Sequence, residues 1–87
     1  MVQSVYTAEY RTFLGLLIAQ RKKAGVTQQE LADRLGRPQS FISKYEHGQR
    51  RLDVVEFLAV ARALGADPHA IFSELEHALG AMSEKPR

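Results

Sequence analysis

Residues 39–46 of this 87-residue chain divide sharply between side chains that hydrogen-bond and side chains that are mainly apolar. The polar members are Gln39, Ser40, Ser43 and Lys44, and the apolar ones are Phe41, Ile42 and Tyr45. At about 100° per residue in a helix, the polar members fall within about 140° of one another and the apolar members lie opposite. Glutamine can pair bidentately with adenine in the DNA major groove, and lysine can reach guanine or phosphate. The pattern indicates a helix anchored by one side that presents base-reading side chains on the other.

Candidate phosphate contacts flank this segment. Gln28 stands at the start of the preceding helical pattern, where free backbone N–H groups attract anions. Arg50 and Arg51 follow the segment and could hold the DNA backbone on the other side. Residues 34–51 carry five basic residues and one acidic one, although the net charge of the chain is only +2. Such a patch is typical of a phosphate-binding face, and a solvated arginine-rich surface is the alternative.

Five helical segments are needed to position these residues. Apolar side chains recur at three- and four-residue spacings, and glycines or capping residues interrupt the pattern. The expected helices cover residues of about 7–24, 27–35, 38–46, 53–64 and 67–79. No strand pattern and no repeat is present in the sequence. We therefore expect one compact all-α domain over residues 1–80, followed by a flexible tail at 81–87.

The starts of these helices carry capping signals. Thr27 and Glu30 form a capping-box pattern, and so do Asp53 and Glu56. Pro38 stands in the first turn of the third helix, where its fixed φ angle and missing N–H are tolerated. The residues expected on the inward or apolar faces are Tyr6, Tyr10, Phe13, Leu14, Leu17, Ile18, Leu31, Ala32, Leu35, Val54, Leu58, Ala61, Leu64, Ile71, Phe72, Leu75 and Leu79.

The sequence lacks the residues that several classes of function require. The chain has no cysteine, and His47, His69 and His77 form no i, i+4 pair, so we expect no metal and no cofactor. No paired carboxylates, serine–histidine arrangement or phosphate-binding loop indicates an enzyme. The N-terminal residues lack a signal-peptide pattern, and no apolar run is long enough to cross a membrane. We expect a cytoplasmic protein with no membrane partner.

The order and spacing of several motifs add a family resemblance. Arg21 precedes Gly25 by four residues, "TQQELADRLG" and "ISKYEHG" follow, and "LAVARALG" supplies Leu58, Ala61 and Leu64. Over residues 13–79 the chain resembles the phage-repressor-type helix-turn-helix family, also called Xre- or Cro-type. The resemblance implies a lambda-repressor-like five-helix domain with its helix-turn-helix at about 27–46. Members are usually dimeric DNA-binding regulators, which implies double-stranded DNA as the partner and a nucleoid location.

The resemblance also implies roles for individual residues. It places a phosphate contact on Gln28, base reading on Gln39, Ser40 and Lys44 with Ser43 nearby, and a structural ion pair between Arg21 and Glu46. The chain departs from the family at Arg37-Pro38, where small or hydroxyl residues are common. Arg37 could therefore reach phosphate. Phe41 is large for its position, and we favour packing of its ring over contact with a thymine methyl group.

We expect a homodimeric, sequence-specific repressor that binds an inverted-repeat operator through the third helix. The fifth helix would form the dimer interface with Ile71, Phe72, Leu75 and Leu79, unless the core of one chain buries all of them. The same scaffold could instead serve as an antitoxin or another protein-interaction module with a regulatory protein partner, or as a restriction–modification controller. The sequence does not separate these roles.

Overall fold

The computed structural model describes residues 7–83, and five α-helices account for most of them. The helices are α1 (Ala8–Lys23), α2 (Gln28–Leu35), α3 (Gln39–Glu46), α4 (Val54–Ala63) and α5 (Pro68–Ser83). No strand occurs between residues 7 and 83. The all-α prediction is therefore confirmed, while Tyr6, which was expected on the stripe of α1, lies outside the described residues.

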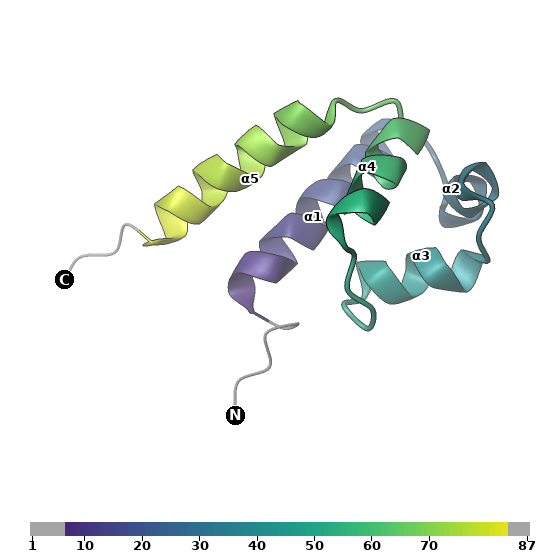
Figure 1. The fold of residues 1–87 in the computed structure, drawn as a ribbon, viewed down its shortest axis with the longest axis horizontal. Coiled ribbons are helices and arrows are strands. Elements are labelled where there is room, and N and C mark those ends of the chain that lie inside the picture. The colour runs from purple at the N-terminus through teal and green to yellow at the C-terminus, as the bar shows by residue number, and fades with distance from the viewer. Residues whose placement is uncertain (1–6, 84–87) are drawn as a thin grey trace.

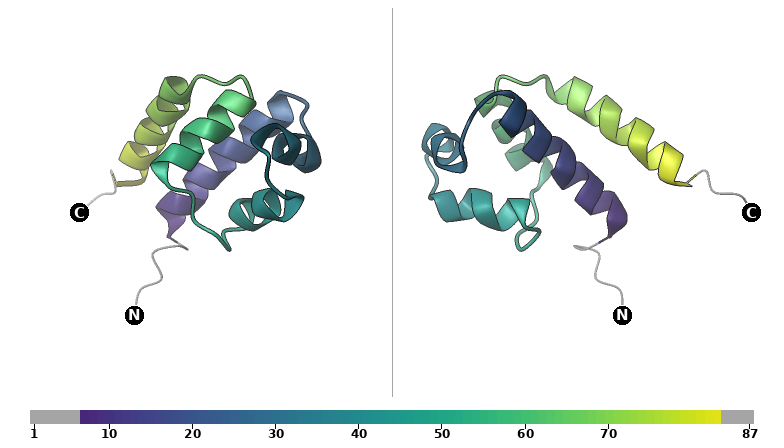
Figure 2. Two further views of the ribbon diagram at one scale, coloured as in Figure 1. Left: turned by 45° about the vertical axis from the view of Figure 1, so that its right-hand side comes forward. Right: turned by 180° about the vertical axis from the view of Figure 1, so that it is seen from behind.

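The helices are arranged around α1, as Figure 1 shows. α5 packs against α1 and runs in the opposite direction, so that the start of α1 and the end of α5 lie at the same end of the molecule. α2 and α3 form a crossed pair on the other side of α1, and α4 contacts both α2 and α5, as the two views of Figure 2 show. α3 is consequently a peripheral helix, with neighbours on one side of its axis.

The helix boundaries follow from local chemistry. The Thr27 Oγ1 atom accepts from the Glu30 backbone N–H at 3.0 Å, and the Glu30 Oε1 atom accepts from the Thr27 N–H at 2.8 Å. Asp53 and Glu56 form the same reciprocal pair at the start of α4. These are the two capping boxes that the sequence predicts. Gly36 ends α2 with a φ of 67°, a left-handed conformation that only glycine adopts without strain.

All five helices contribute side chains to the core. Its fully buried side chains include Leu17 of α1, Leu31 of α2, Ile42 and Tyr45 of α3, and Val60 of α4. The Tyr45 hydroxyl is buried without a hydrogen-bond partner, and desolvation of the phenol raises the pKa of Tyr45. An unsatisfied hydroxyl in this position costs stability, so the tyrosine is not the residue that packing alone would select.

Two predictions about individual positions were wrong. Val54, expected to face inward, is 73% exposed: helical spacing puts it on the same side as Ala61, seven residues later, but in the first turn of α4 that side borders an open apolar groove. Ile71, expected at a dimer surface, is 1% exposed and belongs to the core. The apolar residues of α4 and α5 allow more than one inward face, and the packing of each helix against its neighbours decides which face is buried.

The end of α5 also differs from the prediction. The helix continues to Ser83 rather than ending near Leu79, so the first residues of the expected tail are helical. The Thr12 hydroxyl of α1 donates to the Met82 Sδ atom at 3.5 Å. This contact with α1 supports a last turn that the polar sequence alone would leave frayed. Residues 84–87 of the expected tail lie outside the described residues.

Candidate nucleic-acid interface

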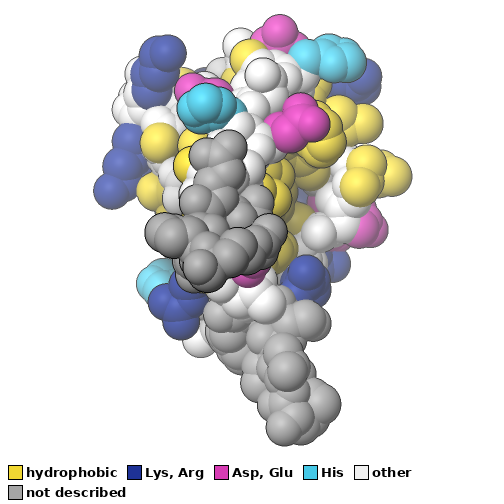
Figure 3. Space-filling view, turned by 90° about the vertical axis from the view of Figure 1, so that its left-hand side faces the viewer, with side chains coloured by type: hydrophobic (Ala, Val, Ile, Leu, Met, Phe, Trp, Pro, Cys, Tyr) yellow, Lys and Arg dark blue, Asp and Glu magenta, His cyan; other side chains and the backbone are white. Residues whose placement is uncertain are grey.

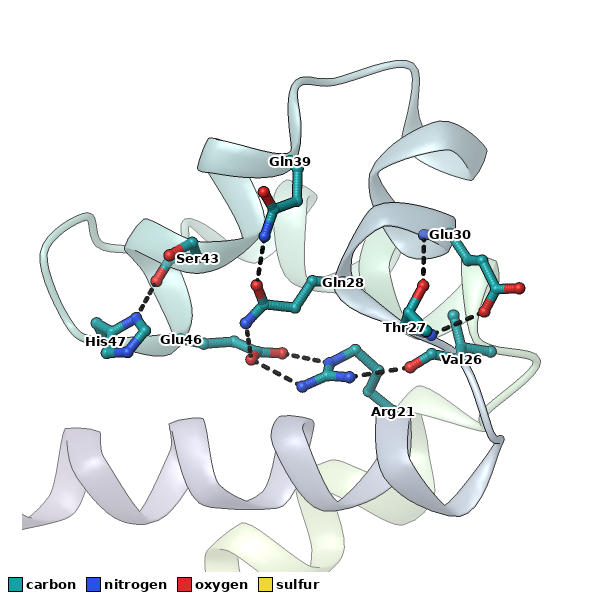
Figure 4. A network of polar contacts seen from close by, with 9 residues as sticks. All are labelled: Arg21, Val26, Thr27, Gln28, Glu30, Gln39, Ser43, Glu46 and His47. Atoms are coloured by element: carbon teal, nitrogen blue, oxygen red, sulfur yellow. Dashed lines mark hydrogen bonds and ion pairs between the residues drawn. The ribbon is translucent and has the colours of Figure 1, made fainter.

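A polar network connects α1, α2 and α3 (Figure 4). The Arg21 Nε atom lies 2.7 Å from Glu46 Oε2, and its Nη2 atom lies 3.1 Å from Oε1. Arg21 Nη1 also donates to the Val26 carbonyl at 2.9 Å. The side chains are 12% and 5% exposed, and the hydrogen bond to Glu46 raises the pKa of Arg21. Arg21 and Glu46, which the resemblance pairs, thus tie the end of α3 to α1 and to the turn before α2.

Two glutamine amides extend this network towards the start of α3. Gln28 Nε2 donates to Glu46 Oε1 at 2.8 Å, and Gln39 Nε2 donates to Gln28 Oε1 at 2.7 Å. A carboxamide has two N–H donors and an acceptor oxygen, so the network leaves one Gln39 donor and its oxygen for an external group. In Figure 4 the oxygen of Gln39 points away from Gln28. The amide of Gln39 is therefore oriented before any ligand binds.

The polar side of α3 is open and the apolar side is closed. Gln39, Ser40 and Lys44 are exposed, and Ser43 is half-buried. On the opposite side lie the buried side chains of Phe41, Ile42 and Tyr45. The Ser43 carbonyl accepts from the His47 ring at 2.7 Å, which places His47 at the end of the same edge. We name Gln39, Ser40, Ser43 and Lys44 the reading edge.

The basic residues near α3 have partners within the chain. Arg50 binds Glu56 through both terminal nitrogens, at 2.9 and 2.8 Å, and this pairing raises the pKa of Arg50 and lowers that of Glu56. The Arg50 and Arg37 guanidinium groups both lie over the ring of Phe41. The Phe41 ring is 6% exposed, so it packs in the protein as we favoured from the sequence.

Two other arginines have separate partners. Arg51 is exposed, and its Cζ atom lies 4.4 Å from the centroid of the Tyr10 ring. The Tyr10 hydroxyl accepts from the Leu52 N–H at 3.0 Å, so α1 holds the loop that carries Arg50 and Arg51. Arg34 instead donates to the Ala63 carbonyl at the end of α4, away from the reading edge. Sequence spacing does not reveal these pairings, because each joins separate elements.

A second surface of different character lies between α1, α4 and α5. It is an open groove of about 420 Å³ lined mainly by apolar side chains, which include Phe13, Val54, Phe57, Phe72 and Leu75. Phe72 is 60% exposed, and Leu75 and Leu79 are half-buried. Figure 3 shows hydrophobic side chains gathered on this side of the molecule. The predicted interface residues thus line one groove, although Ile71 is buried beneath it.

Other classes of site are not built by the described residues. Between residues 7 and 83, no group of three His, Cys, Asp or Glu side chains is arranged to hold a metal ion. No helix in the same range is long and apolar enough to cross a membrane.

The crossed α2–α3 pair with an exposed polar edge on its second helix defines a helix-turn-helix domain. The helix-turn-helix family model matches residues 17–71 of this chain. No curated protein matches the chain. The solved structure of an XRE-family like protein from Pseudomonas syringae pv. tomato str. DC3000 is 51% identical, with a TM-score of 0.80 over 92% of this chain and 93% of that chain.

The chain therefore belongs to the Xre-type helix-turn-helix family. Regulators of this family are DNA-binding proteins and not enzymes, and a DNA-binding regulator is the general function that the family gives to this chain.

Proposed function

We propose that the protein is a homodimeric repressor that binds an inverted-repeat operator, with α3 inserted into the major groove of each half-site. The observation that carries the proposal is the open reading edge on a helix whose other side is buried. A helix of eight residues at the periphery of the domain can enter a groove about 12 Å wide. Occlusion of a promoter by the bound dimer would then repress transcription.

The reading edge offers the chemistry for direct recognition of base pairs. Gln39 presents an amide donor and an acceptor, which match the N7 acceptor and the N6 donor of adenine, and Lys44 presents a cation for guanine or phosphate. Ser40 and Ser43 add hydroxyl groups that accept or donate. Support comes from the Gln28–Gln39 hydrogen bond, because an amide held in one orientation loses less entropy when it binds.

Phosphate contacts would fix the register of α3 in the groove. Gln28 lies at the N-terminus of α2, where backbone N–H groups and the helix dipole favour an anion. Arg37, Arg50 and Arg51 lie on the segments before and after α3. We assign these four residues to positioning contacts, which carry affinity and salt dependence but no sequence information.

Pairing through the groove would place two reading helices on one face of DNA. Operator half-sites lie one helical turn apart, about 34 Å, so two-fold related copies match an inverted repeat. Phe72, Leu75 and Leu79 of α5 are the interface residues in this proposal, and the structure adds Val54 to them. Ile71 is excluded because its side chain is already buried in the core.

The same groove favours a second candidate function. An apolar groove beside an exposed phenylalanine could bind a segment of another protein, as an antitoxin or a comparable interaction module would require. A restriction–modification controller would use DNA binding and pairing as the repressor does. The candidates differ in whether DNA affinity is needed for the activity of the protein.

Selection of bound fragments from random DNA tests the proposal. The full chain is mixed with random duplexes, and bound molecules are recovered, amplified and sequenced. Enrichment of an inverted repeat with half-sites about 10 base pairs apart supports a dimeric regulator. Recovery of unrelated sequences, together with an affinity that is insensitive to salt, would instead favour the protein-interaction module.

A further inference from the structure

Two arginines that are thirteen positions apart in the sequence meet on one aromatic ring. The Arg37 Cζ atom is 3.9 Å from the centroid of the Phe41 ring, and the Arg50 Cζ atom is 4.9 Å from it. The ring packs edge-on against Tyr45, with centroids 5.6 Å apart and an interplanar angle of 63°. Tyr45 is fully buried, so the ring is anchored in the core while its outer side carries two cations.

The position of Phe41 places these cations beside the reading edge. At about 100° per residue, Phe41 lies about 60° from Lys44 around the α3 axis and about 160° from Gln39. Gln39, with its hydrogen bond to α2, therefore borders one flank of the reading edge. The two arginines border the other flank, and contacts with the DNA backbone on both flanks are what a helix in a groove requires.

We propose that Phe41 is a positioning residue that holds Arg37 and Arg50 together as one phosphate-binding unit on the α4 side of α3. The proposal rests on the proposed DNA-binding function and assigns this unit to it. The ring stabilises each guanidinium group by a cation–π contact, and Glu56 fixes the plane of Arg50 by a bidentate pair. Arg50 is still 40% exposed, so a phosphate oxygen can reach it.

The chemistry of arginine explains why such a unit would bind phosphate well. A guanidinium has five donors in a rigid plane and remains charged when it stacks on an aromatic face. Free arginine side chains lose considerable rotamer entropy on binding, and stacking removes part of that loss in advance. Two cations held by one ring also act together, so the loss of either should reduce the contribution of the other.

A simpler role for Phe41 is to fill space under α3, and the salt dependence of binding separates the two roles. We would measure binding to a mixed-sequence DNA duplex over a series of salt concentrations for wild type, Phe41→Leu and Phe41→Tyr. Leucine keeps an apolar side chain without a ring, while tyrosine keeps the ring. Thermal unfolding of each variant shows that it is folded at the temperature of the binding assay.

We expect Phe41→Leu to weaken binding by about three- to tenfold, the loss of two partly exposed cation–π contacts. The slope of log affinity against log salt should fall by about one, because about one phosphate is no longer neutralised. Phe41→Tyr should retain the wild-type slope. A weaker but equally salt-dependent Phe41→Leu protein would show a space-filling role and overturn the proposal.

The arginines give a second readout that leaves the core intact. Arg37→Ala, Arg50→Ala and the double variant are compared on the same duplex. If the two arginines act as one unit, the loss of DNA affinity in the double variant should differ from the product of the two single losses by about twofold or more. If they act independently, the single losses multiply. Multiplicative losses would overturn the proposal. Wild-type protein that shows no salt-dependent DNA affinity would remove the proposed function itself, a result that these variants cannot mimic.

Discussion

The two candidate surfaces of the molecule place their exposed side chains in different environments. On the reading side, polar groups are oriented by hydrogen bonds to other polar groups. Arg21 and Gln28 both donate to Glu46, and Gln39 donates to Gln28. On the groove side, Phe72 is 60% exposed against a hollow lined by other apolar residues. The exposed groups of one surface are hydrogen-bonding groups, and those of the other are apolar.

In the proposed function, the fold separates DNA recognition from self-association. The network reaches the reading edge from α1 and α2, while the groove is built by α1, α4 and α5. A change in one surface should therefore leave the chemistry of the other unaltered. Each of the following variants changes one of the two surfaces, or the residues beneath them, and its effect on the other surface can be measured.

The largest effect is expected from the ion pair beneath the reading edge. Arg21→Met should lower the free energy of unfolding by about 3 kcal/mol, because it leaves the 5% exposed Glu46 carboxylate without its partner. Arg50→Met is the matched control, since the Arg50–Glu56 pair is more exposed and its loss should cost clearly less stability. Urea unfolding measures both. Equal losses would mean that burial does not distinguish the two pairs.

On the groove side, Phe72→Ser should weaken self-association by about 2 kcal/mol, the magnitude of an aromatic hot spot. Val55→Ser is the control, because Val55 is 74% exposed but lies outside the groove lining. Sedimentation equilibrium gives the dimer dissociation constant for each. A dimer that is weakened by Val55→Ser and not by Phe72→Ser would place the interface elsewhere.

On the reading edge, Lys44→Ala should reduce affinity for a selected operator by about 1 kcal/mol and spare binding to random duplex. Lys23→Ala removes the same charge from the exposed end of α1 and should not change the ratio of the two affinities. Electrophoretic mobility shifts with both DNAs give that ratio. A loss on random duplex equal to that on the operator contradicts base reading by Lys44.

The smallest effect concerns the core that both surfaces share. Tyr45→Phe removes a buried hydroxyl that has no hydrogen-bond partner, so the free energy of unfolding should be unchanged or rise by about 1 kcal/mol. Thermal and urea unfolding measure it. Clear destabilisation would mean that the hydroxyl makes an interaction, for example through a bound water. DNA affinity and self-association should not change.

The sequence predicts those features that depend on residues close together along the chain. The capping box of Thr27 and Glu30 spans three positions, and the division of α3 into two faces needs only its helical period. Family resemblance supplied the Arg21–Glu46 pairing, which spans 25 positions.

Features that depend on how helices meet could not be predicted in this way. The exposure of Val54 and the burial of Ile71 depend on the placement of α4 and α5 against α1. The meeting of Arg37 and Arg50 on Phe41 depends on the path of the loop after α3, which the Tyr10 hydroxyl holds. No pattern in the sequence indicates these contacts.

The most direct test is methylation protection of a selected operator by the wild-type protein. Guanine N7 lies in the major groove, so a reading helix there shields it from methylation. We predict two clusters of protected guanine N7 atoms, centred about 10 base pairs apart on one face of the duplex. A bound complex that leaves every guanine N7 reactive, or protects only adenine N3 in the minor groove, would contradict recognition through the α3 edge.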